Sequence, residues 1–205
     1  MLKLNRRAMI ALAAAATAAM TPALAQEAAT EAPGDFSLGS PDAPVKVVEY
    51  ASFTCPHCAT FHANVFKKLK TDYIDTGKVH FTLREVYFDR YGLWAAMVAR
   101  CGGDMRYFGI HDMLFDQQQD WATIQDPMQV VNKLKTIGLT AGLDQASLDA
   151  CLNDQAKAEA LIKQSETNMA ADGVTGTPTI FVNETKHSNM GWDEFKAILD
   201  AELAG

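Results

Sequence analysis

The sequence predicts an α/β domain whose chain is interrupted by an all-helical insertion. Two runs of strand-forming residues, 45–50 and 79–88, flank a segment with helical spacing of apolar residues. Residues 89–170 are helix-like with few strand signals, and strand character returns at residues 179–182. The predicted order is therefore β-α-β, a group of helices, and then β-β-α.

Residues 1–25 have the character of an export signal. A positive start with Arg6 and Arg7 precedes an Ala-rich apolar stretch at residues 8–20, and Ala23-Leu24-Ala25 fits a cleavage site. The apolar stretch is shorter than the roughly 20 residues that span a bilayer, which disfavours an N-terminal membrane anchor. We therefore expect a signal peptide cleaved after Ala25 and export across the inner membrane of a bacterium. The arginine pair leaves open whether the Sec or the twin-arginine route is used.

The charge of the exported part limits its partners. Three of the 18 basic residues lie in the signal, so 15 remain against 25 acidic residues and the net charge becomes −10. A surface of this sign disfavours nucleic-acid binding. The length and apolar content suit one domain with its own core, which excludes disorder along the whole chain.

The first part of the domain is predicted at residues 35–88, after a flexible leader at residues 26–34. The leader is rich in Ala, Glu, Thr and Pro without periodicity. Residues 45–50 form a β-branched strand, and Phe61, Val65, Phe66 and Leu69 recur at helical spacing after it. If that helix is a crossover, the strand at residues 79–88 is parallel to the first.

The helical insertion is predicted at residues 89–170 and the second part of the domain at residues 171–205. Helix-like patterns occupy residues 91–101, 106–115, 127–137 and 143–169. The strand at residues 179–182, a turn at Asn183-Glu184, a short strand from Thr185 and an amphipathic helix at residues 192–203 complete the chain.

The motif Cys55-Pro56-His57-Cys58 lies where the first strand turns into a helix. Cysteines three residues apart on a first helical turn are close enough to alternate between two thiols and a disulfide. The helix N-terminus favours a thiolate at Cys55, Pro56 suits the first turn, and His57 adds a donor or a positive charge. The pattern indicates a redox-active pair in which Cys55 is the nucleophile and Cys58 the resolving thiol.

Two other interpretations of the motif are weaker. The pair could be half of a zinc site, and His62 could supply a third ligand. However, no second Cys-x-x-Cys or His-x-x-x-His completes a tetrahedral set. A purely structural disulfide would close too small a loop to restrain the unfolded chain much. We therefore expect no metal and no cofactor. The other histidines, His62, His80, His111 and His187, are scattered along the chain, and we expect them to be structural or exposed.

The sequence resembles the DsbA-type proteins, which have a thioredoxin fold with an inserted helical domain and are periplasmic. The resemblance extends from about Phe36 to the C-terminus and depends on residues 48–58 (VEYASFTCPHC) and 173–179 (GVTGTPT), with a softer match at residues 108–115 (FGIHDMLF). It implies that Pro178 is a cis-proline facing the dithiol and that Thr177 presents backbone groups to a substrate peptide. An ordinary turn proline is the alternative.

The resemblance assigns further residues. Glu49 takes the place of an acid buried beneath the dithiol, where it would tune the reactive thiol and exchange its proton; a surface acid at a strand edge is the alternative. The four cysteines allow three pairings. Some relatives carry a second disulfide in the helical domain, which implies a structural Cys101–Cys151 bond, with two free thiols as the alternative.

The implied function is a thiol-disulfide oxidoreductase that introduces disulfides into reduced exported proteins. The protein would be a monomer. Its dithiol would be reoxidised by a quinone-linked membrane partner of the DsbB type. Thr177 keeps an isomerase or reductase open, although no dimerisation domain is apparent in the short leader. A non-catalytic peptide-binding module is a third hypothesis, in which Cys55 would be dispensable.

Overall fold

The computed structural model describes residues 33–205, so the expected signal peptide and most of the leader lie outside the described residues. The described chain forms a five-stranded sheet in the order β1-β3-β2-β4-β5. The strands are β1 Phe36–Leu38, β2 Val45–Ala51, β3 Val79–Glu85, β4 Thr179–Val182 and β5 Thr185–Ser188. β2 runs parallel to β3 and antiparallel to β4, and the outer pairs are antiparallel. The predicted parallel βαβ unit is therefore present.

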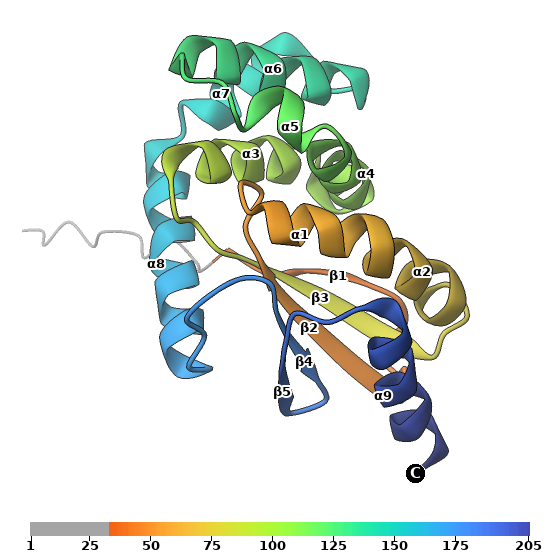
Figure 1. Ribbon diagram of the computed structural model, residues 1–205. Helices are drawn as coiled ribbons and strands as arrows, with labels where there is room; N and C mark the ends of the chain where they lie inside the picture. Colours follow the sequence, from red (N-terminus) through yellow and green to blue (C-terminus); the bar gives the residue numbers. More distant parts are fainter. Residues whose placement is uncertain (1–32) are drawn as a thin grey trace, which may run out of the picture.

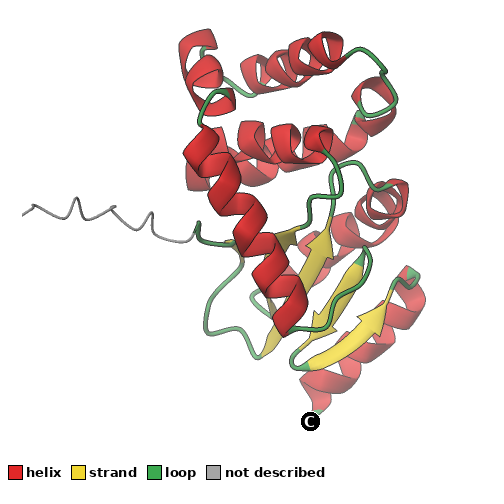
Figure 2. Cartoon of the chain, turned by 90° about the vertical axis from the view of Figure 1, so that its left-hand side faces the viewer, coloured by secondary structure: helices red, strands yellow, loops and turns green. Residues whose placement is uncertain are grey.

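Helices cover both faces of this sheet (Figures 1 and 2). One face packs against α9 (Trp192–Ala204) and against a long helix after β2 that contains two π-helical turns. The opposite face is crossed by α8 (Gln155–Ala171), and the Tyr50 hydroxyl donates to Asp172 at the end of that helix at 2.6 Å. The long helix is α1 Pro56–Phe61, η1 His62–Phe66, α2 Lys67–Leu69 and η2 Lys70–Ile74.

The remaining helices gather beyond the end of the sheet at which α1 begins (Figure 1). They are α3 Arg90–Cys101, α4 Gly103–Asp116, α5 Gln118–Trp121, α6 Pro127–Thr140 and α7 Gln145–Leu152. Trp121, Ile110 and Leu134 are fully buried and belong to the same apolar cluster as the strands and α1. The helices and the sheet therefore share one continuous core, and α1 lies between them.

The structure differs from the local predictions in four places. β1 was not anticipated, because three residues are too few for a recognisable alternation. Residues 143–169 form two helices rather than one, because the Asp154 carboxylate accepts the backbone N–H of Lys157 and starts α8. The short helix α5 was also missed. In addition, the strand predicted at residues 79–88 ends at Glu85.

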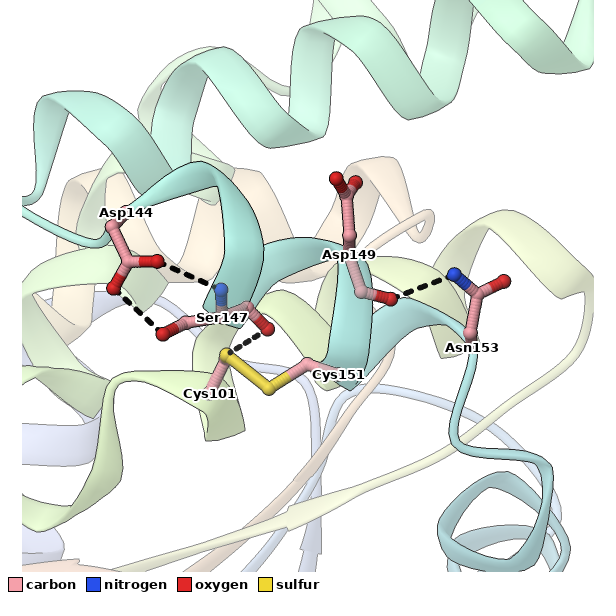
Figure 3. Close-up of a disulfide and its surroundings, with 6 residues drawn as sticks. All are labelled: Cys101, Asp144, Ser147, Asp149, Cys151 and Asn153. Carbon is pink, nitrogen blue, oxygen red and sulfur yellow. Dashed lines mark hydrogen bonds between the residues drawn. A yellow bond between two sulfur atoms is a disulfide. The ribbon is translucent and has the colours of Figure 1, made fainter.

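A disulfide joins Cys101 at the end of α3 to Cys151 in α7 (Figure 3). The two Cα atoms are 6.0 Å apart, within the usual range for a disulfide. Asp144 caps α7 by accepting from both the backbone N–H and the hydroxyl of Ser147, which fixes the start of the helix that presents Cys151.

Replacing both Cys101 and Cys151 with alanine is expected to lower the free energy of unfolding by about 4 kcal/mol, because the bond closes a long loop in the unfolded chain. The bond spans a sequence separation of 50 residues. Urea denaturation under oxidising conditions measures the loss, and wild-type protein unfolded with a reductant is the comparison. Equal midpoints for wild type and variant under oxidising conditions would contradict this prediction.

Candidate active site

Cys55 occupies the N-cap of α1, immediately after the loop that leaves β2. Its backbone is extended, Pro56 fills the first helical position, and the carbonyl of Cys55 accepts the N–H groups of Cys58 and Ala59 at 3.1 and 3.2 Å. A proline suits this position because its missing N–H would have no partner there. The motif therefore sits at a strand-to-helix turn, as its sequence context predicted.

The two thiols of the motif have opposite environments. Both are free in the structure; Cys55 is half-buried, whereas Cys58 is 0% exposed. A hydrogen bond from Cys58, together with smaller contributions from Thr177 and from backbone N–H groups, lowers the pKa of Cys55 to about 5 despite partial burial. Burial, followed by the hydrogen bond to Cys55, raises the pKa of Cys58 well above its usual range. Cys55 is therefore a thiolate at neutral pH and Cys58 a thiol.

The loop before β4 faces Cys55. The Thr177–Pro178 peptide bond is cis, and the carbonyl oxygen of Thr177 lies 3.5 Å from the Cys55 sulfur, where it accepts a hydrogen bond when Cys55 is protonated. The Thr179 hydroxyl donates to the carbonyl of Gly176 at 2.7 Å, and Thr179 pairs with Tyr50 of β2. These contacts hold the backbone of Thr177 against the reactive sulfur.

Glu49 is buried in the central strand of the sheet, only 3% exposed, so it is not a surface acid at a strand edge. Side chains alternate along a strand, and Val47 and Ala51 belong to the apolar cluster that packs against α1. Glu49 therefore points to the face that α1 covers. Burial, with a smaller effect from the Cys55 thiolate, raises the pKa of Glu49 to about 8.

Two groups that tie the motif loop to the helical part were missed by sequence reasoning. Gln118 is 2% exposed, and its side-chain amide donates to the carbonyls of Phe53 and Cys55 at 2.8 and 2.9 Å. Asp89 caps α3 and also accepts the hydroxyl of Thr54 at 2.6 Å. The position of Asp89 just before a helical pattern could have been recognised in the sequence as an N-cap. Nothing in the local sequence distinguishes Gln118 from its polar neighbours.

The histidines are scattered along the sequence, but the fold brings two of them together. His62 and His111 are both buried, and their rings meet edge to face with centroids 5.0 Å apart. They meet because η1 packs against α4, a tertiary contact that sequence spacing does not report. Burial, followed by the neighbouring His111, lowers the pKa of His62 to about 4.

Comparison with known proteins places this geometry in a family. A family model described as thioredoxin matches residues 31–201. A protein of Rickettsia bellii, provisionally named a protein-disulfide oxidoreductase, is 35% identical over 170 residues, which cover 82% of this chain and 64% of the relative. The chain thus spans less than two-thirds of the length of these rickettsial relatives.

Two further relatives match over most of their length. Disulfide bond formation protein D of Bacillus subtilis is 30% identical over 186 residues, covering 84% of this chain and 78% of the relative. The crystal structure of Wolbachia pipientis alpha-DsbA1 superimposes with a TM-score of 0.76 at 30% identity, covering 84% of this chain and 92% of that one. Together with the cysteine pair at the start of α1, these matches establish that the chain belongs to the thioredoxin family and, within it, to the DsbA-like proteins.

Proposed function

We propose that this protein is a periplasmic thiol-disulfide oxidoreductase that introduces disulfides into exported proteins through Cys55-Pro56-His57-Cys58. The observation that carries the proposal is the asymmetry of the pair: Cys55 is accessible and held as a thiolate, and Cys58 is buried and held as a thiol. A stabilised thiolate leaves easily from a disulfide, and it also stabilises the reduced form of the enzyme. Both effects favour transfer of the Cys55–Cys58 disulfide to a reduced substrate protein.

The reaction begins with the Cys55–Cys58 disulfide. A substrate thiolate attacks the Cys55 sulfur, which forms a mixed disulfide and releases Cys58 as a thiolate that takes up a proton. A second substrate thiolate then attacks the substrate sulfur of that mixed disulfide and releases the Cys55 thiolate. The substrate has lost two electrons and two thiol protons, and the enzyme pair has gained the electrons.

The proposed substrate platform is the Thr177–Pro178 loop. Its backbone lies against Cys55, and an extended peptide pairing there as an added strand would bring a cysteine to the reactive sulfur. Glu49 is the proposed proton partner of the buried thiol.

Reoxidation by a quinone-linked membrane protein of the DsbB type, and location in the periplasm after removal of residues 1–25, complete the proposal. Within residues 33–205, no helix is both long and apolar enough to cross a membrane.

The reduction potential of the dithiol tests the direction of the chemistry. Equilibration with glutathione is expected to give a reduction potential of about −120 mV for the dithiol, as in a strong oxidase, rather than about −270 mV, as in thioredoxin. The ultraviolet absorbance of the Cys55 thiolate should titrate with a midpoint near pH 5, where the pKa of Cys55 lies. A thioredoxin-like potential would replace the oxidase with a reductase, and a dithiol that oxidises no reduced protein would leave a peptide-binding module.

A further inference from the structure

We propose that His62, His111 and Asp112 form a binding site for a divalent transition metal such as zinc, between the active-site helix and α4. One ligand atom from each of the three residues lies within 4.8 Å of the others. His62 is the first residue of η1, four positions after Cys58, and the other two residues belong to α4. The site is separate from the dithiol and involves none of the four cysteines.

The environment of His62 supports a metal site. Its side chain is 2% exposed, and neither ring nitrogen has a hydrogen-bond partner among residues 33–205. A buried polar group without a partner is costly, by about 1 to 3 kcal/mol, and is uncommon in folded proteins. The ring is held between Phe66 and Phe115, with centroids 5.2 Å from each. In a ring stacked in this way the two nitrogens point outward in the plane of the ring, and the unprotonated nitrogen keeps a free lone pair.

The spacing of the three donor atoms also supports a metal site. The Nε2 atom of His62 is 3.7 Å from an Asp112 carboxylate oxygen, and Nδ1 of His111 is hydrogen-bonded to the same oxygen at 3.2 Å, a bond that a metal between these atoms would replace. Zinc bonds of about 2.0 to 2.2 Å at a tetrahedral angle place two ligand atoms roughly 3.3 to 3.5 Å apart. The separation at His62 is too long for a hydrogen bond, but a metal between the two atoms would bridge it.

The donor set and the access route also fit a metal. Two imidazoles and one carboxylate suit zinc and other first-row divalent ions. Asp112 is 40% exposed, so the site opens to solvent on its side. Asp116 lies 3.7 Å from Nε2 of His62, but it is also bound by Lys67 at 2.6 Å, so we do not count it as a ligand. The fourth position would remain open to water.

A metal here would join the helix of the dithiol to the helical part of the protein. His62 comes from the same continuous helix as Cys58, and α4 belongs to the group of helices above it in Figure 1.

The test is a titration of Zn²⁺ into the full-length protein with all four cysteines in disulfides, because free thiolates would bind zinc through sulfur. Isothermal titration calorimetry is expected to show one equivalent bound. Co²⁺ used as a second probe should give a visible spectrum without a thiolate charge-transfer band.

Three variants decide where the metal binds. His62→Phe keeps a ring between the two phenylalanines and should weaken zinc binding by at least about 100-fold. Mutating a residue that only hydrogen-bonds to a metal ligand already lowers metal affinity by about 10- to 100-fold, and His62 would be a ligand itself. Asp112→Asn keeps the shape of a half-exposed side chain and should weaken it by about 10-fold or more. His187→Gln, on the distant strand β5, is the control and should leave binding unchanged.

Loss of the single equivalent in the first two variants, with the control unaffected, supports the site. The proposal is overturned if the oxidised protein binds no stoichiometric zinc, or if binding persists in Asp112→Asn and in a folded His62→Phe. Should His62→Phe fail to fold, the Asp112→Asn titration decides alone.

Discussion

Replacing Cys55 with serine should reduce the oxidation of a reduced substrate protein to the uncatalysed rate, whereas replacing Cys58 with serine should trap the enzyme on its substrate. Only Cys55 is both accessible and ionised at neutral pH, so without it no sulfur of the pair can be attacked or can attack. Without Cys58, a mixed disulfide through Cys55 has no resolving thiol and persists.

Non-reducing electrophoresis and mass spectrometry measure this result. Incubation of Cys58→Ser with a disulfide-containing protein should give a covalent adduct that a reductant releases, and Cys55→Ser should give none. The double variant Cys101→Ser/Cys151→Ser is the control, because it removes the other disulfide, leaves Cys55 and Cys58 in place and should retain exchange. An adduct formed through Cys58, or equal activity in Cys55→Ser, would refute the assignment of the nucleophile.

The features that sequence reasoning found are those encoded locally. The motif, its helix and the strands around it follow from neighbouring residues: Pro56 sets a helix start, and alternation marks β2 and β3. The thioredoxin fold with its helical insertion followed from the order of these elements and from the resemblance of residues 48–58 and 173–179, and the comparisons confirm it.

The features that it missed depend on packing between distant segments. Gln118 reaches the carbonyl of Cys55 across 63 positions of sequence, and His62 meets His111 only because η1 lies against α4. Whether Glu49 is buried depends on β2 being the central strand, which alternation within the strand cannot decide. A polar residue in a helical segment has the same local pattern whether it faces solvent or a buried carbonyl.

Replacing Glu49 with glutamine should remove a large part of the pH dependence of stability. Burial raises the pKa of Glu49 from 4.5 to about 8, so the folded protein favours the protonated carboxyl. The stability contributed by that protonated form is fully present below pH 4.5 and is lost as the pH rises through 8. The shift corresponds to an upper bound of about 5 kcal/mol over this range. The glutamine variant has no proton to lose and should therefore gain stability relative to wild type as the pH rises.

Urea denaturation of the oxidised proteins at several pH values between 4 and 9 measures this difference, because oxidation removes the titration of Cys55 from the comparison. The exposed Glu166→Gln on α8 is the matched control and should follow the wild-type profile. If Glu49 also exchanges the proton of Cys58, the variant should oxidise substrates more slowly, by about 100-fold at the low end of general acid-base effects. A normal rate with an altered stability profile would make Glu49 a buried acid without a catalytic role, and an unchanged profile would mean that its carboxyl is ionised at neutral pH in the folded protein.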